Sequence, residues 1–102
     1  MPSYSARRSR DRPPTHPGEL LAEAFEATHL TKTEIAHRLG VSRPHLHEIL
    51  AGRKPVTPIM AAKLGKLFGN DGGLWARMQT AHDLWWASRH ADVSRVKALE
   101  PT

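Results

Sequence analysis

Apolar side chains recur along this chain at the three- and four-residue spacing of an amphipathic helix, in five segments that begin at Pro17. The first segment covers residues 17–28, and its apolar positions are Leu20, Leu21, Ala24 and Phe25. No segment alternates apolar and polar residues as a half-buried strand does. The pattern therefore predicts an all-α fold of five helices.

Capping residues mark where the middle three helices begin and end. Thr31, Ser42 and Thr57 stand at predicted starts, where a hydroxyl oxygen can accept a hydrogen bond from an unpaired backbone N–H. Glycine, which adopts a left-handed turn without strain, follows each of these helices. The glycines are Gly40, Gly52 and Gly69. The expected buried positions are Ile35, Ala36 and Leu39, then Leu46, Ile49 and Leu50, and then Met60, Ala61, Leu64, Leu67 and Phe68.

The fourth and fifth helices each carry a further signal. Gly65 lies inside the fourth helix, where glycine costs about 1 kcal/mol of helix propensity relative to alanine. We therefore expect another part of the chain to pack closely against it. The fifth helix begins near Asp71 and Gly72 and runs at least to Arg89. It carries more apolar surface than burial of one side requires.

Three regions differ in composition. Residues 1–15 are rich in Ser, Arg and Pro, which predicts a flexible basic arm that is either simply solvated or in contact with phosphates. Residues 16–90 hold the five helices and form the expected folded domain. Residues 91–102 form a tail in which Val93, Val96 and Leu99 have helical spacing, so a helical extension is an alternative there.

Composition excludes several classes of protein. The chain has no cysteine, which removes disulfides and thiol chemistry, and no apolar run near the roughly 20 residues of a membrane span. The N-terminal residues lack the apolar region of a secretory signal, so a cytoplasmic protein is expected. His45 and His47 point to different sides of their helix without nearby acidic ligands, and no catalytic motif appears. We expect no metal, no cofactor and no enzymatic activity.

The 102 residues carry 15 Lys and Arg against 10 Asp and Glu, a net charge of +5. Residues 17–28 hold three glutamates and no basic residue, whereas residues 32–54 hold five basic residues and two glutamates. A small domain with a basic centre suits a polyanion on one face and a different partner on the other.

The segment Leu39-Gly40-Val41-Ser42 joins two short amphipathic helices, which is the signature of a helix-turn-helix. Ala36 is small enough for the second of these helices to cross close to the first. Leu46 and Ile49 hold that second helix on the core. This leaves its outer positions to Arg43, Pro44, His47 and Glu48. A helix presented in this way fits the major groove of DNA.

The predicted base-reading residues are Arg43, Pro44 and His47. The Arg43 guanidinium matches guanine O6 and N7, Pro44 can only touch a thymine methyl, and His47 can donate to a base or a phosphate. Glu48 is unfavourable near phosphates unless it accepts from cytosine or pairs with a neighbouring base-reading arginine, and we favour the pairing. Phosphate contacts are expected from Ser42, His45, Arg53 and Lys54.

These residues resemble the HigA (VapI-like) branch of the Xre-type helix-turn-helix antitoxins. The matching stretches are His16-Pro17-Gly18-Glu19, residues 30–36, 39–43 and 48–54, and Leu74-Trp75 with Met78-Gln79 and His82-Asp83-Leu84. The resemblance implies a lambda-repressor-like fold and a dimeric repressor that binds a palindromic operator in its own promoter. It also implies that Lys32 contacts a phosphate, and that the protein neutralises an mRNA-cleaving toxin of the RelE/HigB type.

The fifth helix is the predicted dimerisation element. Trp85 and Trp86 are adjacent and point about 100° apart, so one of them must meet another surface unless both pack under the C-terminal tail. A two-fold homodimer would also set two recognition helices about 34 Å apart, one turn of DNA. The expected dimer residues are Trp75, Met78, His82, Trp85 and Trp86, although Trp75 and Met78 can also close the core of one chain.

Two regions are candidate toxin contacts. One is the acidic face of the first helix, and the other is the basic arm. Their residues are Glu19, Glu23, Glu26, Arg7 and Arg8. Two alternatives remain: a stand-alone phage-type repressor with no toxin, and an interaction protein whose helix-turn-helix no longer binds DNA, as Pro44 and Glu48 would permit.

Overall fold

The computed structural model describes residues 12–100, and over these residues the chain forms five α-helices and no strand. The helices are α2 (Pro17–Thr28), α3 (Lys32–Leu39), α4 (Arg43–Leu50), α5 (Pro58–Phe68) and α6 (Gly73–His90). The prediction of an all-α fold is confirmed. Each predicted helix is present, and its bounds lie within two residues of those expected from the capping signals.

The predicted caps start the middle three helices. The hydroxyl oxygens of Thr31, Ser42 and Thr57 each accept a hydrogen bond of 3.1–3.2 Å from the backbone N–H three residues later. Gly40 and Gly69 adopt left-handed φ values of 70° and 80°. Because these caps satisfy backbone groups that the helix itself leaves unpaired, short helices can follow one another closely.

One hydrophobic core lies between α2, α3, α4 and α5, and α6 closes it. Its buried residues are Leu21, Phe25, Ile35, Ala36, Leu39, Leu46, Ile49, Val56, Met60, Ala61, Leu64 and Trp75. Leu20, expected on the same face as Leu21, is 37% exposed and is not part of this core. Phe25 stacks on Phe68 with ring centroids 5.7 Å apart.

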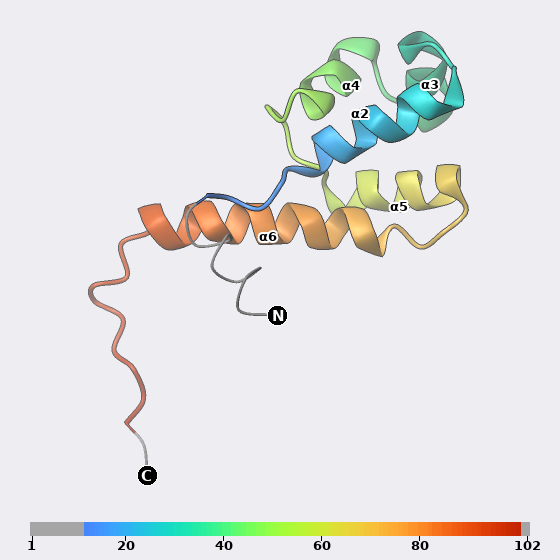
Figure 1. The fold of residues 1–102 in the computed structure, drawn as a ribbon. Helices are drawn as coiled ribbons and strands as arrows, with labels where there is room; N and C mark the ends of the chain where they lie inside the picture. The colour runs from blue at the N-terminus through green and yellow to red at the C-terminus, as the bar shows by residue number, and fades with distance from the viewer. Residues whose placement is uncertain (1–11, 101–102) are drawn as a thin grey trace, which may run out of the picture.

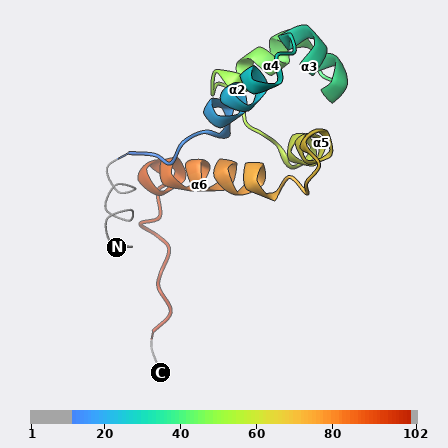
Figure 2. The same ribbon diagram turned by 45° about the vertical axis from the view of Figure 1, so that its right-hand side comes forward.

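The helices form two layers. In Figures 1 and 2, α2, α3 and α4 lie together on one side of the molecule, and α5 and the long α6 lie on the other. The turn between α5 and α6 packs directly on Gly65, where a Cβ atom would lie 2.5 Å from the Gly72 nitrogen. The close packing predicted at Gly65 is therefore present, and it fixes the angle at which α6 leaves α5.

The tail is not a helical extension over residues 91–100. α6 ends at His90, and the next residue, Ala91, has an extended ψ of 136°. Asp92 accepts hydrogen bonds from the backbone N–H and hydroxyl of Ser94, which favours a turn. Leu99 is 96% exposed, so a helix here would bury no apolar face, and short helices without such burial are marginal in water.

Candidate nucleic-acid interface

The outer face of α4 is presented to solvent on a firmly anchored helix. Leu46 and Ile49, on its inner face, are each 1% exposed. Arg43 and Pro44 form its first turn, and His47 follows one turn later; all three are exposed. The three residues predicted to contact bases therefore share one accessible surface.

Lys32 completes this surface from the neighbouring helix. It begins α3, and it lines one shallow hollow together with Arg43, Pro44, His47 and Glu48. A cation from α3 thus lies beside the N-terminal end of α4. Backbone N–H groups and positive charge together make this end suitable for a phosphate.

Ser42 and His45, two of the predicted phosphate contacts, are less well placed for that role than Lys32. The Ser42 hydroxyl is the acceptor that caps α4, in a 3.1 Å hydrogen bond from the His45 N–H. Its remaining hydroxyl proton can still be donated to a phosphate. The His45 side chain is half-buried and does not line the hollow with the other candidates. The structure does not bring His45 into the predicted group.

Glu48 pairs with an arginine, but with a different one from that expected. Its two carboxylate oxygens accept hydrogen bonds from Nε and Nη2 of Arg53, at 2.9 and 2.8 Å. This hydrogen bond holds the pKa of the Glu48 carboxyl below its usual value and raises the pKa of Arg53. The expected pairing with base-reading Arg43 is wrong, because the turn after α4 returns Arg53 to that helix. Arg53, predicted to contact phosphate, is already engaged by an acid.

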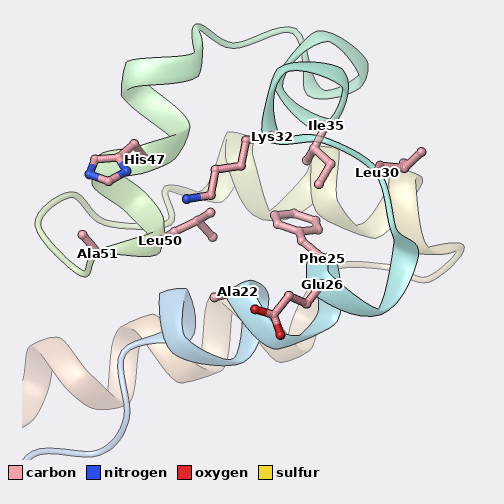
Figure 3. A pocket seen from close by; sticks show the side chains of 9 residues that line it. All are labelled: Ala22, Phe25, Glu26, Leu30, Lys32, Ile35, His47, Leu50 and Ala51. Carbon is pink, nitrogen blue, oxygen red and sulfur yellow. The ribbon is translucent and has the colours of Figure 1, made fainter.

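A second hollow of about 350 Å³ borders the same surface (Figure 3). Lys32 and His47 lie along one side of it, Glu26 of α2 lies across from them, and Phe25 and Leu50 contribute apolar lining. The acidic face of α2 therefore ends next to the basic surface. Its position there keeps a negative charge close to any polyanion bound on α4.

Two residues of the stretches that carry the family resemblance, His16 and Gln79, received no individual role from the sequence. They are the buried polar side chains of residues 12–100, at 8% and 6% exposure. The His16 Nδ1 accepts a 2.9 Å hydrogen bond from Gly18 and caps α2. Gln79 accepts from the Val56 N–H at 2.7 Å. A polar residue directly before Pro17 was the available signal for the cap. Gln79 carried none, because its partner is 23 residues away.

The five predicted dimer residues separate into two groups. Trp75 is 4% exposed and packs against Phe68, so it belongs to the core of one chain and cannot meet a partner. Met78 packs half-buried on the same core. The His82 Nδ1 donates to the Pro14 carbonyl at 2.7 Å. These three have contacts within the chain that account for them.

Trp85 and Trp86 remain as the predicted contacts to a second chain. Their rings meet edge to face at 5.1 Å, and Trp86 is 45% exposed. The Arg89 guanidinium lies 3.8 Å above the Trp85 ring, and His90 stacks on Trp86. The two rings therefore differ in exposure: Trp85 is partly buried, and Trp86 is exposed.

The predicted toxin contacts are only partly described. Glu19, Glu23 and Glu26 are exposed along α2. Arg7 and Arg8 lie outside the described residues. Within residues 12–100, no helix is long and apolar enough to cross a membrane, and no three potential ligands gather into a metal site.

Known proteins are similar to this chain in fold and in sequence. A family model described as a helix-turn-helix domain matches residues 18–78. The antitoxin HigA-1 of Vibrio cholerae is 33% identical over 95 residues, which cover 92% of this chain and 89% of that protein. A solved addiction module antidote protein of a HigA family from Coxiella burnetii has a TM-score of 0.73 and 28% identity, over 89% of this chain and 100% of that one.

A further solved structure is that of the Pseudomonas aeruginosa antitoxin HigA with the higBA promoter, with a TM-score of 0.72 and 27% identity over 86% of this chain and 97% of that one. The fold and the exposed α4 define a helix-turn-helix regulator. More particularly, the chain belongs to the HigA family of helix-turn-helix antitoxins. The resemblance inferred from the sequence is confirmed.

Proposed function

We propose that this protein represses its own operon by binding a palindromic operator as a homodimer, and that it neutralises a toxin of the RelE/HigB type. The observation that carries the DNA-binding part is the shared exposed surface of Lys32, Arg43, Pro44 and His47 on an anchored α4. The solved structure of the Pseudomonas aeruginosa antitoxin HigA with the higBA promoter supports the same use of the fold.

The division of roles follows from the chemistry of each group. Arg43 occupies the first helical position of α4, and its guanidinium is the group we expect to donate two hydrogen bonds to guanine in the major groove. Lys32 and Lys54 supply point charges that suit phosphates rather than base edges. Specificity then comes mainly from Arg43, and salt-dependent affinity comes from the lysines.

The test is a gel shift on the promoter upstream of the operon, repeated at several salt concentrations. Arg43→Ala should weaken operator binding by about 1–3 kcal/mol and relax the base preference at one position of each half-site. The control is Arg77→Ala, which removes the same charge from an exposed position on α6 and should leave the base preference unchanged. If Arg43→Ala weakens binding to all sequences equally, Arg43 is a phosphate contact. If the wild-type chain binds with no salt dependence or not at all, the interaction-protein alternative is correct.

The toxin-binding part rests on the antitoxin family and on the two charged regions. RNA-cleaving toxins are expected to be basic, and α2 presents three exposed glutamates. Co-expression with the small basic protein encoded next to this gene should yield a stable complex and restore growth. Glu19→Gln, Glu23→Gln and Glu26→Gln together should weaken that complex if α2 is the docking surface, whereas Arg7→Ala with Arg8→Ala tests the arm. Failure to form any complex would favour a stand-alone repressor.

A further inference from the structure

The segment that follows the recognition helix is held by side chains from outside the helix-turn-helix. We call residues 51–57 the basic loop, because it carries Arg53 and Lys54. Its backbone is tied to the end of α4 by hydrogen bonds from the N–H groups of Arg53 and Lys54 to the Glu48 carbonyl. Gly52 has a left-handed φ of 79°, which turns the chain back toward α4. These bonds fix one end of the loop only.

Gln79 of α6 holds the other end of the basic loop. Its carbonyl oxygen accepts a 2.7 Å hydrogen bond from the Val56 N–H, in buried surroundings. Its amide nitrogen donates to the Asp83 carboxylate at 2.9 Å, which fixes the orientation of the Gln79 side chain. An unpaired buried N–H is costly, so Val56 favours the position in which this bond is made.

The side chain of His16, which precedes α2, packs beside the middle of the basic loop. Its ring lies against Gly52, where a Cβ atom would be 3.7 Å from the His16 ring carbon Cγ. His16, Gln79 and the basic loop line one common hollow. The His16 ring also meets His82 edge to face at 5.2 Å, so α6 holds His16 as well as the loop.

We propose that Gln79 and His16 are positioning residues for DNA binding, which set the distance of Lys54 and Arg53 from the phosphate backbone. This inference rests on the proposed DNA-binding function. The two buried polar side chains of the described residues both face this one loop, although neither lies on the DNA-facing surface. Buried polar groups that are fully satisfied specify one arrangement of the surrounding chain. The alternative is that they stabilise the fold without any effect on the basic loop.

The first test is a loss and a rescue. Gln79→Leu keeps the volume near that of glutamine but leaves the Val56 N–H without its acceptor. Gln79→Glu combined with Asp83→Asn restores an acceptor for Val56 and a neutral donor beside it. The salt slope is the decrease of log K for operator binding per unit of log [salt]. We expect Gln79→Leu to make this decrease smaller by about 1, and the double variant to restore the wild-type value. Thr80→Ala, at the exposed neighbouring position on α6, is the matched control and should leave the slope unchanged.

A double-mutant cycle separates positioning from general stability. In the wild-type background, Lys54→Ala should weaken operator binding by roughly threefold to tenfold. In the Gln79→Leu background the same substitution should change binding by less than about twofold, since Lys54 is then no longer held near the DNA. Equal effects in both backgrounds would overturn the proposal. If Gln79→Leu does not fold, His16→Asn takes its place in the cycle, because asparagine still caps α2 but is too short to support Gly52.

Amide hydrogen exchange tests the anchoring of the basic loop separately from the proposed DNA-binding function. The Val56 N–H should exchange faster in Gln79→Leu than in the wild type, while the amides of α4 keep their protection. Unchanged protection at Val56 would refute the role of Gln79. If the wild-type chain does not bind its operator but Val56 behaves as expected, then the proposed function fails and the anchoring of the basic loop stands.

Discussion

At the scale of single residues, the ion pair between Glu48 and Arg53 determines how much of the positive charge near α4 is available. A bidentate pair at 2.8–2.9 Å occupies the edge of the guanidinium that would otherwise meet a phosphate. Both side chains are accessible to solvent, so the pair is easily exchanged for water or for another anion. We therefore expect the pair to weaken the proposed contact of Arg53 with a DNA phosphate.

Glu48→Ala should free the Arg53 guanidinium from this ion pair. We expect tighter binding to non-operator DNA and a salt slope steeper by about 1, because Arg53 becomes free to neutralise one more phosphate. Glu100→Ala, which removes the same charge in the exposed tail, should not change the slope. Gel shifts on random and operator duplexes measure both quantities. A loss of operator binding on the order of 1–3 kcal/mol with Glu48→Ala would instead mean that Glu48 accepts a hydrogen bond from cytosine.

Local chemistry in the sequence was sufficient to predict the caps and the exposed face of α4. Thr31, Ser42 and Thr57 each accept a hydrogen bond from a backbone N–H three residues later. Because both partners are close in the sequence, the sequence alone indicates the contact. The partner of Glu48 was not predictable in the same way. Arg53 lies five residues later, beyond the helix end, and only the turn at Gly52 brings it back.

At the scale of helices, Gly65 shows a conflict between propensity and packing. Alanine would favour the helix by about 1 kcal/mol, but its Cβ would lie 2.5 Å from the Gly72 nitrogen and 2.7 Å from the Asn70 oxygen. These are backbone atoms and cannot rotate away. We expect Gly65→Ala to lower the free energy of unfolding by about 1–3 kcal/mol in urea titrations. Lys66→Ala, exposed on the same helix, should have little effect, and an increase in stability with Gly65→Ala would contradict the packing.

The cap of α2 should make stability depend on pH. Burial, and then the proximity of His82, lower the pKa of His16 below its ordinary value of 6.5, while its backbone hydrogen bond to Lys54 and the carboxylates of Asp83 and Glu19 act in the opposite direction. The neutral ring is the form that accepts from Gly18. As the pH falls below 6.5, the unfolded chain binds a proton at His16 more readily than the folded chain, so stability decreases until the folded pKa is passed.

His16→Asn is the variant that isolates this effect. The asparagine amide oxygen can cap α2 at any pH, so the difference in unfolding free energy between pH 7.5 and pH 5.5 should be smaller in the variant than in the wild type. Thermal or urea unfolding at the two pH values measures this. Both proteins keep the other histidines, but His82 loses its edge-to-face contact with the His16 ring in the variant, so the same comparison is repeated in a His82→Gln background. An identical loss of stability in both would mean that His16 is not the titrating group.

Across the helices, periodicity predicted best where one face alone is buried. Ile35, Ala36 and Leu39 of α3 are all in the core, as their spacing indicated. α6 was harder, because Trp75 near its start and Trp86 near its end are equally apolar in sequence but differ tenfold in exposure, 4% against 45%. Trp75 follows directly after the turn that packs on Gly65, and helical periodicity does not describe how such a turn directs the next helix.

At the scale of the whole molecule, α3 and α4 lie on the side opposite α6 (Figure 1). The predicted base contacts belong to α4 and Lys32 to α3, whereas the exposed ring of Trp86 belongs to α6. Trp86→Ala should therefore shift the chain from dimer to monomer in sedimentation equilibrium without unfolding it. Aromatic side chains that become buried dominate interface energies. Leu99→Ala, at a position 96% exposed in the tail, is the control for lost apolar surface. A dimer that survives Trp86→Ala would place the interface elsewhere.

The spacing of operator half-sites tests the dimer and the DNA surface together. Two recognition helices related by a two-fold axis can contact one face of the duplex only if their half-sites lie about 34 Å, one helical turn, apart. Insertion of about 5 base pairs at the operator centre turns one half-site to the opposite face and should reduce binding to that of a single half-site. Trp86→Ala should make binding to the natural and the extended operator equal, because a monomer meets each half-site separately. Equal affinity of the wild-type protein for both operators would show that each chain binds independently, in which case the exposed end of α6 serves a partner other than a second copy.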